Sequence, residues 1–273
     1  MPDYHARPYE GVRDLPLLIA LAQASGRPPQ PRYYHPGDFV WQLCIFDATE
    51  DVRLWLDGDE AVACAIFEPP LTFQFVIHPA AVERHVLTAE VLQWVEGRRA
   101  LVKAKDAIPI AYRELGNETL STTALDSDAE RNDLLTRAGY VRRGPAGVRF
   151  ARVLDGPLPE GVLPDGARFC SVTDDEVEAR AELHRDAWSV WGPSAYSGAR
   201  YQRLREAPLY EAGLDIVLAY EDRFVSYCVC WLDTDNGVGY FEPVGTHSAA
   251  ARRGFGRGVI REGMRRLRER GMR

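Results

Sequence analysis

The stretch SAAARRGFGRGVI, residues 248–260, decides how the second half of the chain folds. It follows an apolar, strand-like run and leads into a helix with one apolar stripe. A loop between a strand and a helix brings unpaired N–H groups and the positive helix end together, and phosphate groups bind readily there. Gly254 and Gly256 let the backbone approach such a ligand without a Cβ atom in the way.

Positive charge surrounds these glycines although the chain is acidic. Arg252, Arg253 and Arg257 add charge-assisted donors to the loop, and the arginines are concentrated between Arg252 and Arg273. The formal net charge of the whole chain is −7, which argues against a nucleic-acid partner. A local cationic patch on an acidic protein indicates a small anionic ligand.

Several kinds of site share a glycine loop of this type. A Walker A loop requires Gly-Lys-Ser/Thr, which the stretch lacks. A dinucleotide-binding fold requires a parallel strand unit and an acidic residue further along, whereas hairpins precede this loop. An ordinary helix N-terminus with solvated arginines is the plain alternative for a bare Gly-x-Gly.

Composition bounds the remaining classes. The 273 residues are 46% hydrophobic and 27% charged, the balance of a globular domain. No apolar run reaches membrane-spanning length and no signal-peptide pattern begins the chain, so we expect a cytoplasmic protein with no membrane partner. The cysteines are scattered, and the pair Cys228 and Cys230 lacks a second ligand pair, so we expect no metal.

A linker-like stretch, LDGPLPEGVLPDGA, divides the chain. Its prolines and glycines predict neither helix nor strand. We therefore expect one domain over residues 1–153, a linker over 154–166 and a second domain over 167–273.

The two halves predict the same order of elements. In the first we expect a strand and helix within 5–25, a hairpin over 52–68, a strand over 71–79, a helix over 82–99, a strand near 120–125, a helix from the capping box at Ser127 to Gly139, and a strand or hairpin over 140–154. In the second we expect a strand over 167–172, a helix after the capping box at Thr173, a helix over 199–207, a hairpin over 215–233, a strand over 237–247 and a helix over 258–270. This predicts an α/β (α+β) chain of two similar domains, each with a mostly antiparallel sheet flanked by helices.

The loop and its flanks, EPVGTHSAAARRGFGRGVIREGMRRLRERG, closely resemble motif A of the GNAT superfamily of N-acetyltransferases. That family's loop reads Q/R-x-x-G-x-G/A and holds the pyrophosphate of acetyl-coenzyme A. Here the first position is Ala251, which removes one side-chain contact and leaves the backbone cradle. The resemblance covers nearly all of residues 167–273 and implies acetyl-CoA as co-substrate.

The resemblance also assigns residues to the cofactor. In the family the pantetheine arm inserts where two strands splay apart, and Pro243 cannot donate to a neighbouring strand. The implied cofactor-binding residues are Val244, Gly245, Thr246, Arg252, Arg253, Gly254, Phe255, Gly256, Arg257 and Gly258.

Glu242 is the candidate base that takes a proton from the acceptor amine. Strand alternation places Glu242 on one face with Val238, Tyr240, Val244 and Thr246. Burial near the splay would raise its pKa into a useful range. A structurally paired glutamate is the alternative.

The acceptor site should come from the segment HRDAWSVWGPSAYSGARY, which corresponds to the acceptor-shaping helices of the family. Its candidate pocket residues are Trp188, Trp191 and Tyr196. These aromatic residues could equally fill the core. The expected acceptor is a small-molecule amine.

Two further expectations follow from the resemblance. The family continues after motif A with further strands and a helix, so we expect a second domain that lacks these elements and an exposed strand edge that a homo-oligomer could cover. The first half resembles a degenerate copy, because its loop over Val82–Val86 contains no glycine and Glu83 would repel a pyrophosphate. We expect no coenzyme there.

The leading hypothesis is thus a tandem GNAT acyltransferase that acetylates a small amine through its second half. A non-catalytic acyl-CoA-binding or scaffold protein is the alternative, favoured by Ala251. A nucleotide-binding module is a third, and it would bind adenosine nucleotides that lack the pantetheine arm equally well.

Overall fold

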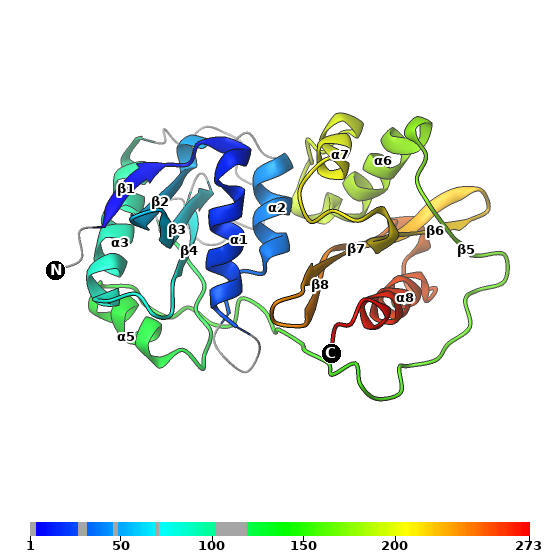
Figure 1. Ribbon diagram of the computed structural model, residues 1–273. Coiled ribbons are helices and arrows are strands. Elements are labelled where there is room, and N and C mark those ends of the chain that lie inside the picture. Colours follow the sequence, from blue (N-terminus) through cyan, green and yellow to red (C-terminus); the bar gives the residue numbers. More distant parts are fainter. Residues whose placement is uncertain (1–3, 27–31, 46–48, 69–70, 102–118) are drawn as a thin grey trace. The chain divides into compact units, whose positions relative to one another are not determined.

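The computed structural model describes residues 4–26, 32–45, 49–68, 71–101 and 119–273. The chain divides into two compact units (Figure 1). Unit 1 contains residues 1–34 and 48–151, and unit 2 contains residues 35–47 and 152–273. Each unit has one four-stranded sheet whose neighbouring strands are antiparallel, which confirms the predicted fold class.

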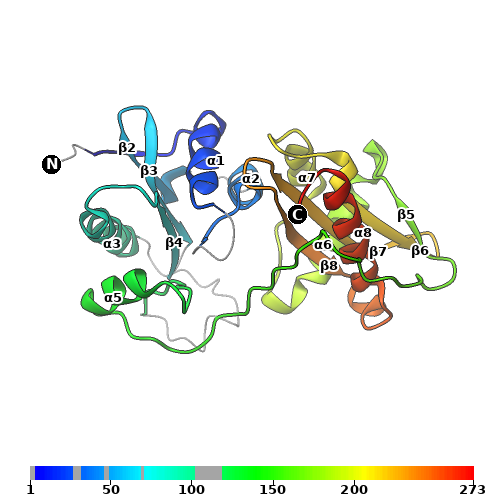
Figure 2. The same ribbon diagram turned by 60° about the horizontal axis from the view of Figure 1, so that its bottom comes forward.

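Unit 1 follows the predicted order of strands and helices closely. Its elements are β1 (His5–Pro8), α1 (Leu15–Ala24), β2 (Val52–Asp57), β3 (Glu60–Glu68), β4 (Thr72–Ile77), α3 (Arg84–Leu101) and α5 (Ala129–Arg137). The sheet order is β1-β2-β3-β4, and α1 and α3 cover opposite faces (Figures 1 and 2). The buried stripe of α3, which includes Leu87 and Val91, packs with Trp55 and Phe73 of the sheet. The apolar stripe of the helix, which repeats every 3.6 residues, and the apolar side chains that alternate along the strands therefore pack in one core.

Two predicted strands of unit 1 are wrong. Near 120–125 only Ser121 forms an isolated bridge, to Thr72. Residues 140–153 form neither strand nor helix, because glycine and proline at 144–147 interrupt the alternation; Phe150 is 89% exposed. The N-cap of α5 lies one residue after the predicted Ser127, because Asp128 caps the helix by accepting from the Arg131 N–H at 3.0 Å.

Unit 2 has the same sheet order, β5-β6-β7-β8. Its elements are α2 (Pro36–Ile45), β5 (Arg168–Cys170), α6 (Val177–Ala187), α7 (Gly198–Arg205), β6 (Asp215–Tyr220), β7 (Arg223–Asp233), β8 (Val238–Thr246) and α8 (Phe255–Glu269). Helix α8 packs on β6, β7 and β8, and the other face of the sheet is covered by α6 and α2.

Both units also contain short 3-10 turns. In unit 1 they lie at Gly11–Asp14 and Thr49–Asp51, and in unit 2 at Asp174–Glu176, Ser189–Trp191, Ala212–Leu214 and Ser248–Ala250. No helix in the described part of the chain is both long and apolar enough to cross a bilayer.

Helix α2 lies early in the sequence but belongs to unit 2. The predicted domain boundaries differ from the two units at this point. Gly37, in the first turn of α2, faces the ring of Trp231 on β7, and a Cβ atom built on Gly37 would lie 2.2 Å from Trp231 Cγ. The absence of that Cβ lets the helix backbone approach the sheet.

The predicted linker packs as part of unit 2. As expected, residues 154–166 contain no helix or strand. Leu154 is buried in the core beneath α8, and Leu158 and Leu163 pack against it. Gly258 of α8 gives room for Leu163, whose Cδ2 would lie 2.6 Å from an added Cβ.

The close approach of α2 to β7 predicts that a methyl group added at Gly37 destabilises the protein. Gly37→Ala forces the helix or Trp231 to move, so we expect a loss of about 1–3 kcal/mol in the free energy of unfolding. The matched control is Gly97→Ala in α3, where an added Cβ has nothing within 4 Å and better helix propensity stabilises the chain slightly. Urea unfolding measures both. A Gly37→Ala protein as stable as the control contradicts the packing of α2 on β7.

Candidate functional site

The glycine loop forms an open N-terminus on α8. Gly254 is the N-cap, with φ 92° in the left-handed region, and no side chain caps the helix. A helix leaves its first N–H groups without intrahelical partners, so the amides of Phe255, Gly256 and Arg257 are available to a ligand. The amide of Gly258 already donates to the Gly254 carbonyl at 3.0 Å.

A depression of about 290 Å³ lies over this helix end. It is lined by Thr246, Ala251, Arg252, Gly254, Gly256 and Arg257. Arg252 and Arg257 are exposed, which leaves their guanidinium groups accessible to an anion. Backbone donors, positive charge and two glycines without Cβ atoms therefore meet here, as a pyrophosphate requires.

Five of the predicted cofactor residues lie outside the lining of this depression: Val244, Gly245, Arg253, Phe255 and Gly258. The Arg253 guanidinium stacks over the Tyr220 ring at 4.5 Å and lies 5.2 Å from the Phe255 ring. The Phe255 side chain is fully buried in the core, and Gly258 packs against Leu163. Phe255 can offer its backbone amide alone, and Arg253 braces the loop in this arrangement.

Strand β8 contains a bulge beside the loop. Cys228 pairs with Val244 and Cys230 with Phe241, so Glu242 and Pro243 together oppose one residue of β7. Beyond the bulge, the His247 N–H donates to the Val225 carbonyl. Because hydrogen-bonded and non-hydrogen-bonded pairs alternate in antiparallel strands, Val244 and Thr246 turn their backbone N–H and C=O groups away from β7. No strand pairs with that edge in the described part of the chain.

The predicted common face of β8 is wrong because of this bulge. Phe241 and Val244 pack in the core under α8, and Thr246 lies beside Gly256. Tyr240 instead stacks on His35, next to α2. The extra residue reverses the alternation, so Glu242 lies on the α2 and α6 face while Val244 and Thr246 lie on the α8 face. Strand alternation alone could not have shown this.

The side chain of Glu242 is half-buried. Burial and the nearby negative charge of Asp38 raise the pKa of the Glu242 carboxyl to about 7. Its backbone carbonyl accepts from Trp231 Nε1 at 2.6 Å. Glu242 thus has the proton affinity that suits a base near neutral pH.

The aromatic residues predicted for the acceptor pocket gather around His184 of α6. Trp188 Nε1 donates to the Tyr227 hydroxyl at 3.0 Å, and that hydroxyl lies 2.6 Å from His184 Nδ1. The Tyr196 ring lies 4.3 Å from the His184 ring. Burial, with a smaller effect from Arg180, lowers the pKa of His184 to about 3. His184 is therefore neutral and, since the indole N–H must donate, accepts the tyrosine proton.

Of the three predicted pocket residues, the structure describes the side chains of Trp188 and Tyr196. Trp188 and Tyr196 lie together on this face, and Tyr196 is buried, with no hydrogen-bond partner for its hydroxyl among the described residues. The side chain of Trp191 lies outside the described part of the structure.

Sequence reasoning missed the contribution of α2 to this face. Trp41 lies 5.5 Å from the His184 ring and 5.6 Å from the Tyr196 ring. The sequence did hold a helix signal, proline at the first helical position and Asp38 two residues later. Nothing in it indicated that the helix packs in unit 2.

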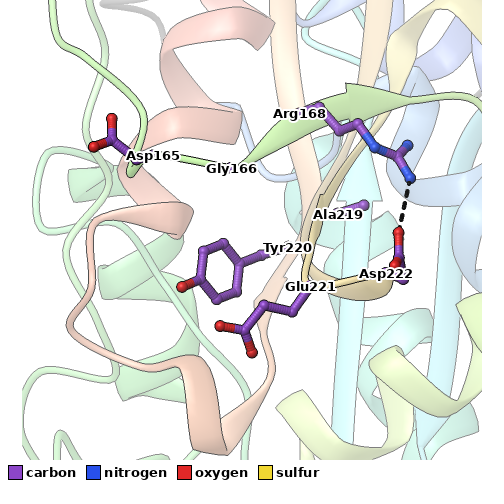
Figure 3. Close-up of a pocket in the computed structure, with 7 residues that line it drawn as sticks. All are labelled: Asp165, Gly166, Arg168, Ala219, Tyr220, Glu221 and Asp222. Atoms are coloured by element: carbon purple, nitrogen blue, oxygen red, sulfur yellow. Dashed lines mark ion pairs between the residues drawn. The ribbon is translucent and has the colours of Figure 1, made fainter.

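A second hollow, of about 250 Å³, lies at the β6–β7 turn (Figure 3). It is lined by Asp165, Gly166, Arg168, Ala219, Tyr220, Glu221 and Asp222. Arg168 forms a 3.6 Å ion pair with Asp222, and Figure 3 shows Asp165 at the opposite end. The excess of carboxylates makes this hollow unsuited to a pyrophosphate. In the described residues no group of histidine, cysteine or acidic side chains could hold a metal ion.

The raised pKa of Glu242 predicts a pH-dependent stability. Its folded-state pKa of about 7 exceeds the ordinary 4.5, so the folded state binds the proton more tightly and the free energy of unfolding falls as pH rises between these values. Glu242→Gln removes this loss. We expect the variant to gain about 1–3 kcal/mol relative to the natural chain between about pH 5 and about pH 8. Urea unfolding at both pH values measures the gain, and a difference that does not change with pH contradicts it.

Comparisons with known proteins agree with this geometry. Residues 178–273 match the model of the acetyltransferase (GNAT) family. Over the whole chain, the fold is similar to a GCN5-related N-acetyltransferase from Sphaerobacter thermophilus, with a TM-score of 0.55, 19% identity and coverage of 100% of this chain and 85% of the other. A tandem GNAT protein from the clavulanic acid biosynthesis pathway has a TM-score of 0.54 and 16% identity, with coverage of 98% of this chain and 87% of the other. An acetyltransferase from the GNAT family from Colwellia psychrerythraea has a TM-score of 0.52 and 11% identity, with coverage of 98% of this chain and 87% of the other.

The search of curated proteins found no match. At these identities the solved structures show the fold, and the matched residues include the glycine loop, β8 and α8. Residues 178–273 are a domain of the GNAT acetyltransferase family, in a chain with the tandem GNAT fold.

Proposed function

We propose that unit 2 transfers the acetyl group of acetyl-CoA to the amine of a small-molecule acceptor. The proposal rests on one observation: three features follow one another along the free edge of β8. The open N-terminus of α8 lies at one end, the free backbone groups of Val244 and Thr246 follow, and Glu242 comes next.

The residues fit acetyl-CoA in the following way. The pyrophosphate would lie in the depression, held by the Gly256 and Arg257 amides and the Arg252 guanidinium. The pantetheine arm would pair with the outward backbone groups of Val244 and Thr246, as an added strand does. A thioester supplies a carbonyl carbon that an amine can attack.

Glu242 would act as the base. The acceptor amine attacks the thioester carbonyl, a C–N bond forms, and the C–S bond breaks with the coenzyme leaving as a thiolate. The Glu242 carboxylate accepts the proton that the amine loses. Because its pKa is about 7, the base is half ionised near neutral pH and still strong enough to take that proton.

The acceptor should enter from the α2 and α6 face, where Glu242 lies. Trp188 and Tyr196 gather there around the neutral His184. Aromatic faces favour an acceptor with an apolar body, and the acidic Glu242 favours an acceptor that arrives as an ammonium ion.

The placement of the pyrophosphate predicts the effect of a charge in the loop. A Cβ on Gly256 would lie 2.9 Å from Thr246 Oγ1, and a carboxylate there would repel the phosphates. We expect Gly256→Glu to weaken acetyl-CoA binding at least about 100-fold in calorimetric titration. Gly97→Glu, on an open surface of unit 1, is the matched control and should bind as the natural chain does. Equal binding by the Gly256 variant would place the cofactor elsewhere.

The role of Glu242 predicts a separation of binding from turnover. Glu242→Gln keeps the size of the side chain and loses the base, so we expect kcat/KM to fall about 100-fold or more with acetyl-CoA affinity unchanged. Loss of thioester absorbance, followed with a panel of primary amines, measures the rate. Full activity in the variant removes Glu242 from the mechanism. Tight acetyl-CoA binding without turnover of any amine favours the non-catalytic acyl-CoA-binding alternative.

A further inference from the structure

The first turn of α2 is docked beside Glu242. The His35 ring, at the start of the helix, stacks on Tyr240 with centroids 5.0 Å apart, and His35 Nε2 lies 3.4 Å from the Val238 carbonyl oxygen. Tyr240 precedes Glu242 by two residues, so both side chains lie on the same face of β8. Helix α2 therefore meets the strand where the candidate base lies.

Trp231 connects the helix to the backbone of the base. Its ring touches Gly37 of α2, and its indole N–H donates to the Glu242 carbonyl at 2.6 Å. Trp231 is completely buried. The position of α2 relative to Glu242 is thus fixed by a rigid, buried side chain on β7.

Asp38 is fixed in the same turn. One of its carboxylate oxygens accepts the backbone N–H of His35 at 2.6 Å, and the His35 ring nitrogen Nδ1 accepts the Gly37 N–H at 3.0 Å. This reciprocal cap holds a short acidic side chain at a defined place. A negative charge held there acts on Glu242 more strongly than a mobile surface charge does.

The ionisable groups around Glu242 come from each element that packs there. Helix α2 contributes His35 and Asp38, β7 contributes Tyr227, and α6 contributes His184, which lies 2.6 Å from the Tyr227 hydroxyl. Helix α6 also contributes the buried Arg180, whose guanidinium lies 3.5 Å from the centre of the Tyr227 ring and pairs with Asp215. His184 is neutral, since burial lowers its pKa to about 3, and burial raises the pKa of Tyr227, so that this phenol is neutral too. Asp38 is the charged neighbour that acts on Glu242.

We propose that Asp38 is a positioning residue for the reaction, acting from α2 on the Glu242 carboxylate as a fixed negative neighbour. The first half of the sequence then supplies a working part of the site in unit 2. What Glu242 does in catalysis rests on the proposed function, whereas the effect of Asp38 on Glu242 does not.

Asp38→Asn tests this with little change of structure. Asparagine keeps an oxygen that can accept the His35 N–H and removes the charge. Asp38→Ser also keeps an acceptor and serves as a second neutral variant, while Asp38→Glu keeps the charge. The matched control is Asp222→Asn, which makes the same charge change at a side chain that is 98% exposed in unit 2, at φ 58°, a conformation that asparagine tolerates.

The carboxyl carbon of Glu242, labelled with carbon-13 and assigned with Glu242→Gln, reports its pKa by nuclear magnetic resonance without any substrate. We expect the pKa to fall by about 0.5–1 pH unit in Asp38→Asn and Asp38→Ser, and to stay unchanged in Asp38→Glu and Asp222→Asn. An unchanged pKa in both neutral variants, or an equal fall in Asp222→Asn, overturns the proposal.

The pH dependence of the activity is a second test of the effect of Asp38 on Glu242. With an amine that is turned over, the acid limb of kcat/KM against pH should move to lower pH in Asp38→Asn by the amount found in the titration. A loss of rate at all pH values without that movement identifies Asp38 as merely structural and contradicts the proposal. If Glu242→Gln is fully active, Glu242 is not the base of the proposed function, and the resonance titration still decides whether Asp38 acts on Glu242.

Discussion

The bulge between β7 and β8 is the constraint on which the rest of the site depends. Two residues of β8, Glu242 and Pro243, oppose one residue of β7. If the side chains of β8 alternated regularly through residues 240–246, Glu242 would share a face with Val244 and Thr246, against the core of α8. Because of the bulge, the carboxylate lies on the α2 and α6 face, while the backbone beyond the bulge meets the glycine loop on the α8 face. The free strand edge lies between the two, so an extended ligand can run from the helix end to the Glu242 carboxylate without crossing the sheet.

Burial on the α2 and α6 face gives Glu242 its chemistry. A carboxylate removed from water and placed near Asp38 holds its proton more tightly, which raises its pKa to about 7. The same face keeps His184 neutral, so this imidazole carries no competing positive charge. This arrangement lowers the free energy of unfolding as pH rises from 4.5 to about 7, and it is the pattern of perturbed ionisation expected at a functional site.

Sequence reasoning predicted the parts of the fold that depend on local chemistry. The glycine loop, the apolar stripe of α3 and the capping box at Thr173 each specify their element within a few residues, and the structure has all three. Local chemistry could not predict on which face of β8 Glu242 lies, or that α2 packs in unit 2. The face of Glu242 depends on a shift of strand register. The packing of α2 depends on the fit of Gly37 against Trp231, nearly two hundred residues away in the sequence. The two sheets also have the same strand order, yet α2, which follows α1 as α7 follows α6, packs in unit 2.

In the proposed function, acetyl-CoA binds along the glycine loop and the free edge of β8. Titrating acetyl-CoA into nitrogen-15-labelled protein and following the backbone amide resonances tests it most directly. We predict that the amides of residues 254–257, Val244 and Thr246 shift together at one affinity, while those of residues 82–86 in unit 1 do not move. Shifts confined to residues 82–86, or the absence of shifts at Val244 and Thr246, would contradict the account.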